Sequence, residues 1–222
     1  MFFNTYQTTK IGQEFVKYAL RIGAIQFSTN GIELKCGKIS PYFFNSGLFN
    51  TTNRLAVLTS CYIKVLKQVN KDFDVIFGPA YKGIPLAAAM VMGLKDCYHD
   101  IAYAYDRKEE KSYGEGGSIV GSNMQGKKVV IIDDTITDGI TKTEALEVIH
   151  ASAGVPVMLL IAFDRMEKNQ NHMYISQEFS KENGILVHSI ANLLDLIETL
   201  RQQDNEDMLN LVLTHCDKED LL

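Results

Sequence analysis

The sequence predicts an α/β fold, in which a parallel sheet is covered by helices on both faces. Its expected strands are short and apolar throughout, which is typical of strands buried on two sides, and they alternate with helical patterns along the chain. The 222 residues suit a single domain spanning residues 1–222, and a hydrophobic content of 46% is enough to fill its core.

The first fifty residues predict a helix followed by a small β appendage. Apolar residues recur from Ile11 to Ile22 at the three-to-four spacing of an amphipathic helix, and Gly31 is expected to mark the break after it. Two β-rich runs, IELKCG and PYFFNSG, flank a turn from Gly37 to Pro41. These runs predict a hairpin-like appendage beside the main sheet.

Helices and strands then alternate regularly. Apolar residues at helical spacing predict helices, and continuous apolar runs bounded by turn residues predict strands. The expected elements are helices at 55–69, 84–94 and 141–153, strands at 74–78, 101–106, 129–133, 155–163 and 185–190, and a short helix before the last strand. The acidic tail, residues 204–222, carries apolar residues at helical spacing and predicts a terminal helix.

Composition excludes several classes of function. The net charge of −5 offers no general attraction to nucleic acid or to an anionic membrane. The N-terminus lacks the pattern of a signal peptide, and no apolar run is long enough to span a bilayer. The four cysteines form no CxxC pair, and the five histidines show no metal-ligand spacing. We therefore expect a soluble cytoplasmic protein with no nucleic-acid or membrane partner and no metal held mainly by protein ligands.

Polar stretches follow four of the expected strands. Ligands bind at the carboxyl ends of the strands in parallel sheets, and these ends carry GPAYKG, YDRKEEK, DDTITDG and FDRME. The glycine-rich segment from Ser112 to Gly126 shows neither helical nor strand period. A long loop of this kind in a compact domain is usually functional and favours a lid, with a disordered connector as the alternative.

The stretch VVIIDDTITDGIT, Val129 to Thr141, predicts a site for a phosphorylated ribose. Asp133 and Asp134 emerge from a buried strand, where their carboxylates can accept hydrogen bonds from adjacent ribose hydroxyls. The following turn has hydroxyl side chains around Gly139 at the start of a helix, where backbone amides and the helix dipole favour a phosphate. The alternative, that the two acids only cap the helix, suits an isolated acidic pair better than this combination.

A second phosphate motif is rejected. Gly121 to Lys127 reproduces the glycine and lysine spacing of a nucleotide-triphosphate loop. Lys128, however, stands where Ser or Thr should bind magnesium, and the segment precedes a strand instead of following one.

The same stretch resembles the phosphoribosyl-diphosphate motif of the type I phosphoribosyltransferases. Four further stretches, LKCGKISPYFFNSGLFN, GPAYKGIPLA, YDRKEEKSYGEGG and AFDRME, resemble the orotate phosphoribosyltransferases of that family in the same order. The resemblance implies the family's fold, a central parallel sheet flanked by helices with a small N-terminal hood formed by about residues 1–50.

The resemblance also implies roles for individual residues. Lys35, Tyr81 and Lys82 are expected at the diphosphate donor, and Phe43 and Phe44 at the orotate ring. Arg107, Lys108, Lys111 and Tyr113 stand at positions of the mobile lid that closes over the diphosphate, partly in the neighbouring subunit's site. The turn residues expected to hold the donor are Thr135, Ile136, Thr137, Asp138, Gly139, Ile140 and Thr141. Thr137 and Arg165 match orotate-binding positions, and a guanidinium can bond both oxygens of a carboxylate.

Four positions depart from the family pattern. Thr135 replaces an aliphatic residue or Ser, and Asp138 replaces a small residue, so an inward-pointing Asp138 is expected to weaken phosphate binding. Tyr113 replaces a His found in many bacterial members, which removes an imidazole but keeps a hydrogen-bond donor. Cys36 replaces Ser and is a weaker donor.

The implied reaction joins orotate to 5-phosphoribosyl 1-diphosphate in a homodimer, with Mg²⁺ held mainly by the donor and water. Arg107, Lys108, Lys111, Asp133 and Asp134 are its expected catalytic residues. Two alternatives remain open: a phosphoribosyltransferase for another base, and a nucleotide-sensing regulator on the same fold. The first should lack YFFN and Arg165, and the second should have a degraded lid and a basic face.

Overall fold

The computed structural model describes residues 6–34, 37–111, 117–214 and 216. Its helices are α1 (Lys10–Arg21), α2 (Thr52–Val69), α3 (Gly83–Leu94), α4 (Ile140–Ala151), α5 (Ile175–Asn183), α6 (Leu193–Gln202) and α7 (Glu206–Leu213), with a short 3-10 helix at Ser46–Leu48. Its strands are β1 (Ile25–Glu33), β2 (Ile39–Phe44), β3 (Val75–Gly78), β4 (Ala102–Lys111), β5 (Gly117–Gly121), β6 (Lys128–Asp133), β7 (Val155–Asp164) and β8 (Leu186–Asn192).

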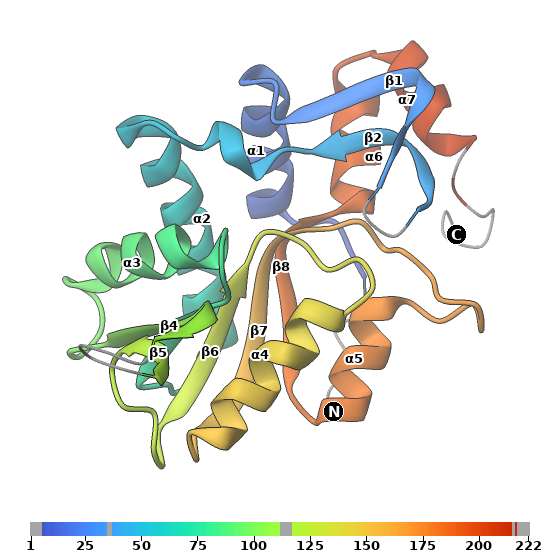
Figure 1. The fold of residues 1–222 in the computed structure, drawn as a ribbon. Helices are drawn as coiled ribbons and strands as arrows, with labels where there is room; N and C mark the ends of the chain where they lie inside the picture. The colour runs from blue at the N-terminus through green and yellow to red at the C-terminus, as the bar shows by residue number, and fades with distance from the viewer. Residues whose placement is uncertain (1–5, 35–36, 112–116, 215, 217–222) are drawn as a thin grey trace.

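The main sheet has six strands in the order β5-β4-β3-β6-β7-β8 (Figure 1). Every neighbouring pair is parallel except β4 with β5. The predicted α/β class, with a mostly parallel sheet flanked by helices, is confirmed. Because β3 and β6 are adjacent, the segments that follow both strands emerge side by side at one edge of the sheet.

Alternate residues of the central strands enter two separate cores. Val130 and Ile132 pack with α1, α2, α3 and α6, whereas Val129 and Ile131 pack with α4 and α5 on the opposite face. All four side chains are almost completely buried. Coverage on both faces explains why these strands are apolar throughout, which is the pattern that predicted a parallel sheet.

The first helix ends earlier than expected. Helix α1 stops at Arg21, and the chain turns at Gly23, whose φ is +72°, before β1 begins at Ile25. Gly31, predicted to mark the end of the helix, lies instead within β1, where its φ is +76° and a Cβ would come within 2.2 Å of the Ile39 side chain. Gly31 therefore lies at the irregular part of the β1–β2 pairing, between Phe27 and Ile32, and not at the end of a helix.

Part of the segment expected to be a lid without regular structure, Ser112 to Gly126, is a strand. Strand β4 continues through Lys111, five residues beyond the predicted end at residue 106, and Gly117–Gly121 returns as β5 in antiparallel pairing. Arg107, Lys108 and Lys111 are therefore strand residues. The polar run DRKEEK did not predict this extension of β4, because backbone pairing with β5 at the edge of the sheet requires no apolar side chains. We call β4 and β5 together the lid hairpin.

Helix α6 is an element that the sequence reading missed. Asn192 caps α6 by accepting hydrogen bonds from the amides of Leu194 and Asp195, and the Asp195 carboxylate accepts a hydrogen bond from the amide of Asn192. The Asp195 carboxylate also accepts from the Thr9 amide at 2.7 Å, which fixes the start of α1 against α6. The signal was present as Asn-Leu-Leu-Asp, the spacing of a capping box.

The expected N-terminal hairpin and C-terminal helix are both present. Strands β1 and β2 pair antiparallel, and they lie above the carboxyl ends of the main sheet in Figure 1. The Lys38 ammonium donates to Glu167 and to the Lys168 carbonyl, which ties the hairpin to the segment after β7. Helix α7 buries Val212 in the core that it shares with α6. Among the described residues, no helix is long and apolar enough to cross a membrane.

Candidate active site

A cavity of about 270 Å³ opens where β3, β6 and β7 end beneath the hairpin; we call it the strand-end cavity. Its walls come from four separate parts of the chain. The lining residues are Leu34, Phe43, Phe44, Pro79, Ala80, Tyr81, Lys82, Asp133, Asp134, Thr135, Thr137, Thr141, Lys142 and Arg165. The structure thus brings together ten of the predicted site residues, which lie up to 122 positions apart in the sequence (Phe43 to Arg165).

Asp133 is buried at the floor of this cavity and already has two donors. Its Oδ1 accepts the amide of Asp134 at 2.9 Å, and its Oδ2 accepts the ammonium of Lys142. The Tyr62 hydroxyl from α2 donates to the Asp133 carbonyl and holds the end of β6 in place. Burial raises the pKa of the Asp133 carboxyl, and the neighbouring Lys142 charge opposes that rise.

Asp134 is equally buried but more strongly paired. Its Oδ2 accepts the Lys82 ammonium at 2.7 Å and the Ser46 hydroxyl at 2.6 Å, and its Oδ1 accepts the Thr135 amide at 2.9 Å. Burial acts to raise the pKa of this carboxyl, but the Lys82 charge and the hydrogen bonds from Lys82 and Ser46 together bring it below its usual value. Asp134 is therefore a carboxylate at neutral pH.

The turn after β3 presents Tyr81 and Lys82 at the rim. A Cβ on Gly78 would come within 2.1 Å of the Gly83 carbonyl, so this turn can close tightly only with glycine. The Ala80–Tyr81 peptide bond is cis, and the Ala80 amide donates to the Asp106 carboxylate of β4 at 2.6 Å. Tyr81 is 72% exposed, and the Lys82 side chain is 55% exposed. Both side chains can therefore move when a ligand arrives.

The turn after β6 leads into the N-terminus of α4, as predicted. Gly139 has a φ of +76° and directly precedes the helix, and Thr137 and Thr141 on either side of it line the cavity. Ile136 is 2% exposed and packs in the core, so its side chain cannot contact a ligand. Asp138 is exposed, yet its Oδ1 accepts the Ile140 amide at 3.1 Å. Its carboxylate thus bonds one of the amides that were expected to receive a phosphate.

Arg165 and Phe43 present groups to the cavity, whereas Phe44 lies mainly in the core behind it. The Arg165 guanidinium donates to the Tyr42 carbonyl, the Ser40 hydroxyl and Glu167, which leaves further N–H groups for a ligand. Phe43 is partly exposed to the cavity. Phe44 is 2% exposed and stacks on Phe163 at 5.6 Å between ring centres, so its ring belongs mainly to the core.

Several predicted residues lie outside the cavity wall. The Lys108 ammonium pairs with Glu144 of α4 at 3.1 Å, on the surface. Arg107 is half-buried on β4, and Lys111 ends that strand. Lys35, Cys36 and Tyr113 lie outside the described residues, as does the side chain of Lys111.

The sequence reading missed Lys142 and Ser46. Lys142 stands in the first turn of α4, so a helical projection from Gly139 could have placed it beside the acids of the motif. Ser46 begins the short helix after β2, and no sequence signal links it to Asp134. Among the described residues, no group of three or more His, Cys, Asp or Glu side chains stands close enough together to hold a metal ion.

Comparison with known proteins shows which family this chain resembles. Residues 46–188 match the model of the phosphoribosyl transferase domain. The chain is 42% identical over 197 residues to the orotate phosphoribosyltransferase of Photobacterium profundum, covering 88% of this chain and 91% of that protein. It is 43% identical over 204 residues to that of Thioalkalivibrio sulfidiphilus, covering 91% and 92% of the two chains.

Solved structures give the same result. A crystal structure of orotate phosphoribosyltransferase from Francisella tularensis aligns with a TM-score of 0.79 at 34% identity, covering 91% of this chain and 96% of that chain. Leishmania donovani UMP synthase aligns with a TM-score of 0.75 at 25% identity, covering 92% of this chain and 42% of that longer one.

Proposed function

The chain belongs to the phosphoribosyltransferase family, among the orotate phosphoribosyltransferases, and from that premise we propose how its own residues carry the reaction. The reaction transfers the 5-phosphoribosyl group of 5-phosphoribosyl 1-diphosphate, the donor, to orotate in pyrimidine biosynthesis. It releases diphosphate and forms orotidine 5′-monophosphate. The observation that carries the proposed roles is that one cavity combines the two carboxylates of the motif with Phe43 and Arg165.

The ribose of the donor binds at Asp133 and Asp134. Carboxylates accept hydrogen bonds from adjacent hydroxyls, and both acids line the cavity where β6 ends. Lys82 now bonds Asp134, but its side chain is more than half exposed. When a ribose hydroxyl takes its place on Asp134, the Lys82 ammonium becomes available for the negatively charged diphosphate.

The 5-phosphate binds at the N-terminus of α4, and orotate binds opposite it. The turn from Thr135 to Thr141 offers backbone amides, three threonine hydroxyls at the cavity and the positive end of the helix dipole. Phe43 lies against the orotate ring, and the remaining N–H groups of Arg165 bind its carboxylate. Because Tyr42, Ser40 and Glu167 hold the guanidinium, Arg165 is oriented before orotate arrives.

Catalysis rests on positioning and electrostatics. The bond from the anomeric carbon to diphosphate breaks while the orotate nitrogen attacks the opposite face, with inversion and an oxocarbenium-like transition state, and no covalent intermediate is needed. The lid hairpin carries Arg107, Lys108 and Lys111, and Tyr113 lies between its two strands in the sequence. In this proposal the lid closes over the departing diphosphate, neutralises its charge and excludes water.

Mg²⁺ enters this site on the donor. Asp133 and Asp134 offer the oxygen ligands that Mg²⁺ prefers, but each is bonded to a lysine. Oxygens of the donor and water would therefore supply most of the ligands of a bound Mg²⁺. When bound, the ion neutralises the leaving group.

Replacing Asp138 with Asn is expected to lower the KM for the donor by about fivefold, because a negative charge leaves the phosphate-binding turn. Asn can still accept the Ile140 amide through its side-chain oxygen, so the start of α4 keeps its cap. Initial rates at varied donor concentration measure the change. An increase in KM would instead make Asp138 a contributor to donor binding.

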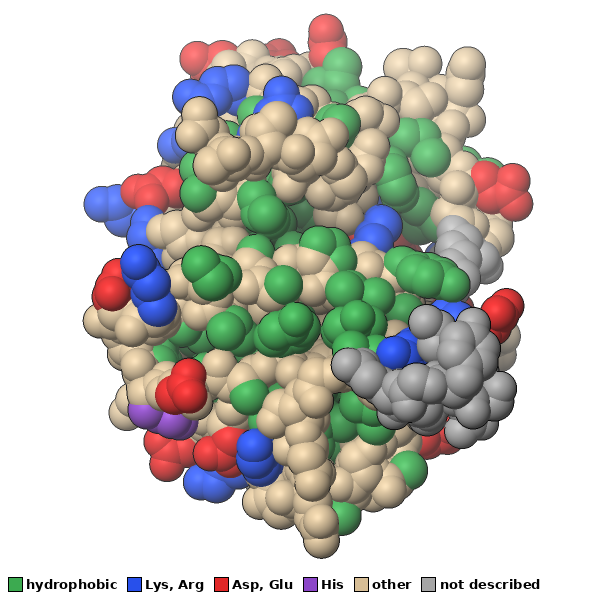
Figure 2. All heavy atoms as spheres, turned by 60° about the vertical axis from the view of Figure 1, so that its left-hand side comes forward, with side chains coloured by type: hydrophobic (Ala, Val, Ile, Leu, Met, Phe, Trp, Pro, Cys, Tyr) green, Lys and Arg blue, Asp and Glu red, His purple; other side chains and the backbone are tan. Residues whose placement is uncertain are grey.

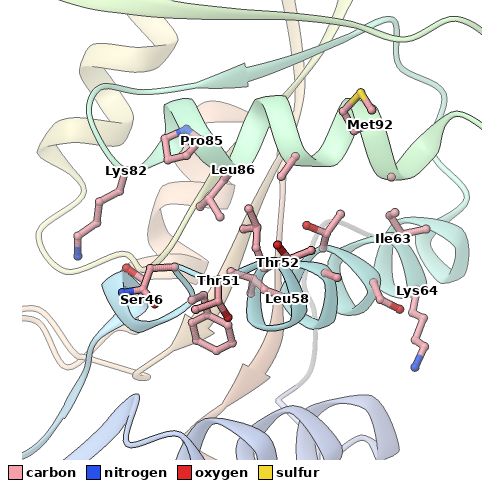
Figure 3. A pocket seen from close by; sticks show the side chains of 18 of the residues that line it. Ser46, Thr51, Thr52, Leu58, Ile63, Lys64, Lys82, Pro85, Leu86 and Met92 are labelled. Atoms are coloured by element: carbon pink, nitrogen blue, oxygen red, sulfur yellow. The ribbon is translucent and has the colours of Figure 1, made fainter.

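We propose that the enzyme acts as a homodimer whose partner docks between α2 and α3. A groove of about 1240 Å³ runs between these helices and is lined mainly by apolar side chains, including Ile63, Leu86 and Met92 (Figure 3). Hydrophobic side chains gather in a band across this side of the molecule (Figure 2), and Met92 is 70% exposed. Lys82 lines both the groove and the strand-end cavity, and Ser46 of the groove donates to Asp134 of that cavity, so a second copy seated here would lie beside the site and could share its lid.

Replacing Met92 with Glu is expected to shift the protein to a monomer and to lower activity at least about tenfold, since a charge cannot be buried in an apolar interface. Met173, also exposed but outside the groove, provides the matched control, and its replacement by Glu should change neither property. Sedimentation velocity and initial rates are the measurements. A Met92→Glu protein that stays dimeric would remove this face from the proposal.

A base panel tests the choice of substrate. With labelled donor and Mg²⁺, orotate should be consumed while uracil, adenine, guanine and hypoxanthine are not. Transfer to one of those bases in place of orotate would contradict the assignment of Phe43 and Arg165. Donor binding without transfer to any base would contradict the enzymatic function itself.

A further inference from the structure

Lys142 makes an ion pair that the roles assigned so far leave unexplained. It lies in the first turn of α4, lines the strand-end cavity and is 6% exposed. Among the described residues it is the one lysine that is buried. Its ammonium donates to Asp133 Oδ2, and Asp133 is itself 5% exposed. Lysines are almost never fully buried unless paired, so this position demands a partner of opposite charge.

The two lysines of the cavity differ in their freedom to move. Lys82 and Lys142 each pair with one acid of the motif, Asp134 and Asp133 respectively. The Lys82 side chain is 55% exposed, whereas that of Lys142 is 8% exposed. Lys82 can therefore leave its acid for solvent or for a diphosphate. Lys142 has no comparable route, so its charge stays beside Asp133 whether or not a ligand is present.

Lys142 opposes two effects that favour the protonated form of Asp133, namely burial and a neighbouring negative charge. Asp134, the residue directly after β6, places a second negative charge beside Asp133, and the Asp134 partner Lys82 approaches from the turn after β3. The Tyr62 hydroxyl from α2 faces only the backbone carbonyl of Asp133. Burial and the neighbouring carboxylate both disfavour an ionised Asp133, and Lys142 from α4 is the cation in direct contact with it. A protonated Asp133 would lose part of its capacity to accept hydrogen bonds from a ribose.

We propose that Lys142 is a positioning residue that keeps Asp133 ionised and oriented to receive a ribose hydroxyl of the donor. The inference rests on the proposed role of Asp133 in donor binding. The Lys142 ammonium donates to Asp133 Oδ2, and the Asp134 amide donates to Asp133 Oδ1. These two donors fix the orientation of the carboxylate, and a ribose hydroxyl bonds the same two oxygens. Its effect is expected on donor binding and on the dependence of that binding on pH.

Replacing Lys142 with Met tests this role, because Met keeps most of the volume and removes the charge. The KM for the donor should rise at least about tenfold while kcat changes less than about threefold. The ratio of kcat/KM between variant and wild type should also fall at least about tenfold further between pH 9 and pH 6, because without the Lys142 charge the pKa of the Asp133 carboxyl rises further and the carboxyl is protonated at higher pH in the variant than in the wild type. A ratio that is the same at both pH values would make Lys142 a packing residue and overturn the proposal.

Two controls separate this effect from damage to the fold. Glu147→Gln changes a charge on the exposed face of the same helix and should leave the KM and the pH profile unchanged. In the Asp133→Asn background, Lys142→Met should add less than about twofold to the KM, since its proposed action passes through that carboxylate. A full additional increase would contradict the proposed route.

A measurement on the wild-type protein does not depend on the variant folding. The Asp133 carboxyl carbon, assigned by comparison with Asp133→Asn, should have the chemical shift of an ionised carboxylate at neutral pH in an NMR experiment on the free protein. A protonated Asp133 at neutral pH would overturn the inference even if orotate transfer is confirmed. Isothermal calorimetry with the donor alone at pH 6 and pH 9 tests it without turnover, so its failure and that of the proposed function remain distinguishable.

Discussion

Replacing Asp134 with Asn is expected to lower kcat/KM for the donor by about a hundred- to a thousandfold, the range found when one fixed electrostatic contact to a transition state is removed. Asp134 is a buried carboxylate in contact with Lys82, Ser46 and the Thr135 amide. Asn retains the shape and one acceptor but loses the charge on which the ribose hydroxyl and Lys82 both depend. Initial rates at varied donor concentration measure the loss.

Asp138→Asn is the matched control for this change. It makes the same substitution four residues later in the same motif, at an exposed position where the charge is expected to hinder phosphate binding. The two variants should therefore change kcat/KM for the donor in opposite directions. If they reduce it equally, the motif acts only through its overall charge, and the separate roles of Asp134 and Asp138 fail.

Replacing Lys111 with Ala is expected to lower turnover at least about a hundredfold with folding intact, because a lid cation stabilises the departing diphosphate. Lys111 is the last residue of β4 on the lid hairpin. Lys128→Ala removes the same charge at the start of β6, where Lys128 pairs with Asp72 on the surface, and should leave turnover unchanged. Near-normal turnover of purified Lys111→Ala would end its assignment as a catalytic residue.

Mixed dimers test whether the lid acts across subunits. If Lys111 serves the partner's site, a heterodimer of Lys111→Ala with Asp134→Asn contains one site with both defects and one site with none. An equal mixture that exchanges subunits freely should then recover about a quarter of wild-type activity. Activity no higher than the mean of the two separate variants would place each lid over its own subunit's site.

The main sheet was predictable because its physical signal is local. Strands such as β6 and β7 are buried on both faces and are therefore apolar throughout, and the helices between them carry apolar residues at helical spacing. The lid hairpin was missed where that signal stops, because β4 and β5 pair through backbone groups at the edge of the sheet and carry polar side chains. Helix α6 had a local signal in its capping box, which was overlooked.

From the residue pattern alone, the site was predictable only as far as its motif reached, whereas Phe43, Lys82 and Arg165 were expected only through the family resemblance. The carboxylates of Asp133 and Asp134 and the turn before α4 follow from residues adjacent in sequence. Their partners do not, because Ser46 and Lys82 come from other elements and meet Asp134 only through the order of strands. The contact of Asp138 with the Ile140 amide likewise depends on a side-chain conformation that spacing cannot give.

One measurement tests the central claim most directly. Orotate, the donor and Mg²⁺ are mixed with the purified protein, and the absorbance of orotate is followed together with the release of diphosphate. The account predicts that orotate absorbance falls in proportion to the diphosphate released, and that omitting the donor or Mg²⁺ prevents both changes. Unchanged orotate absorbance, with donor bound or another base consumed, would contradict it.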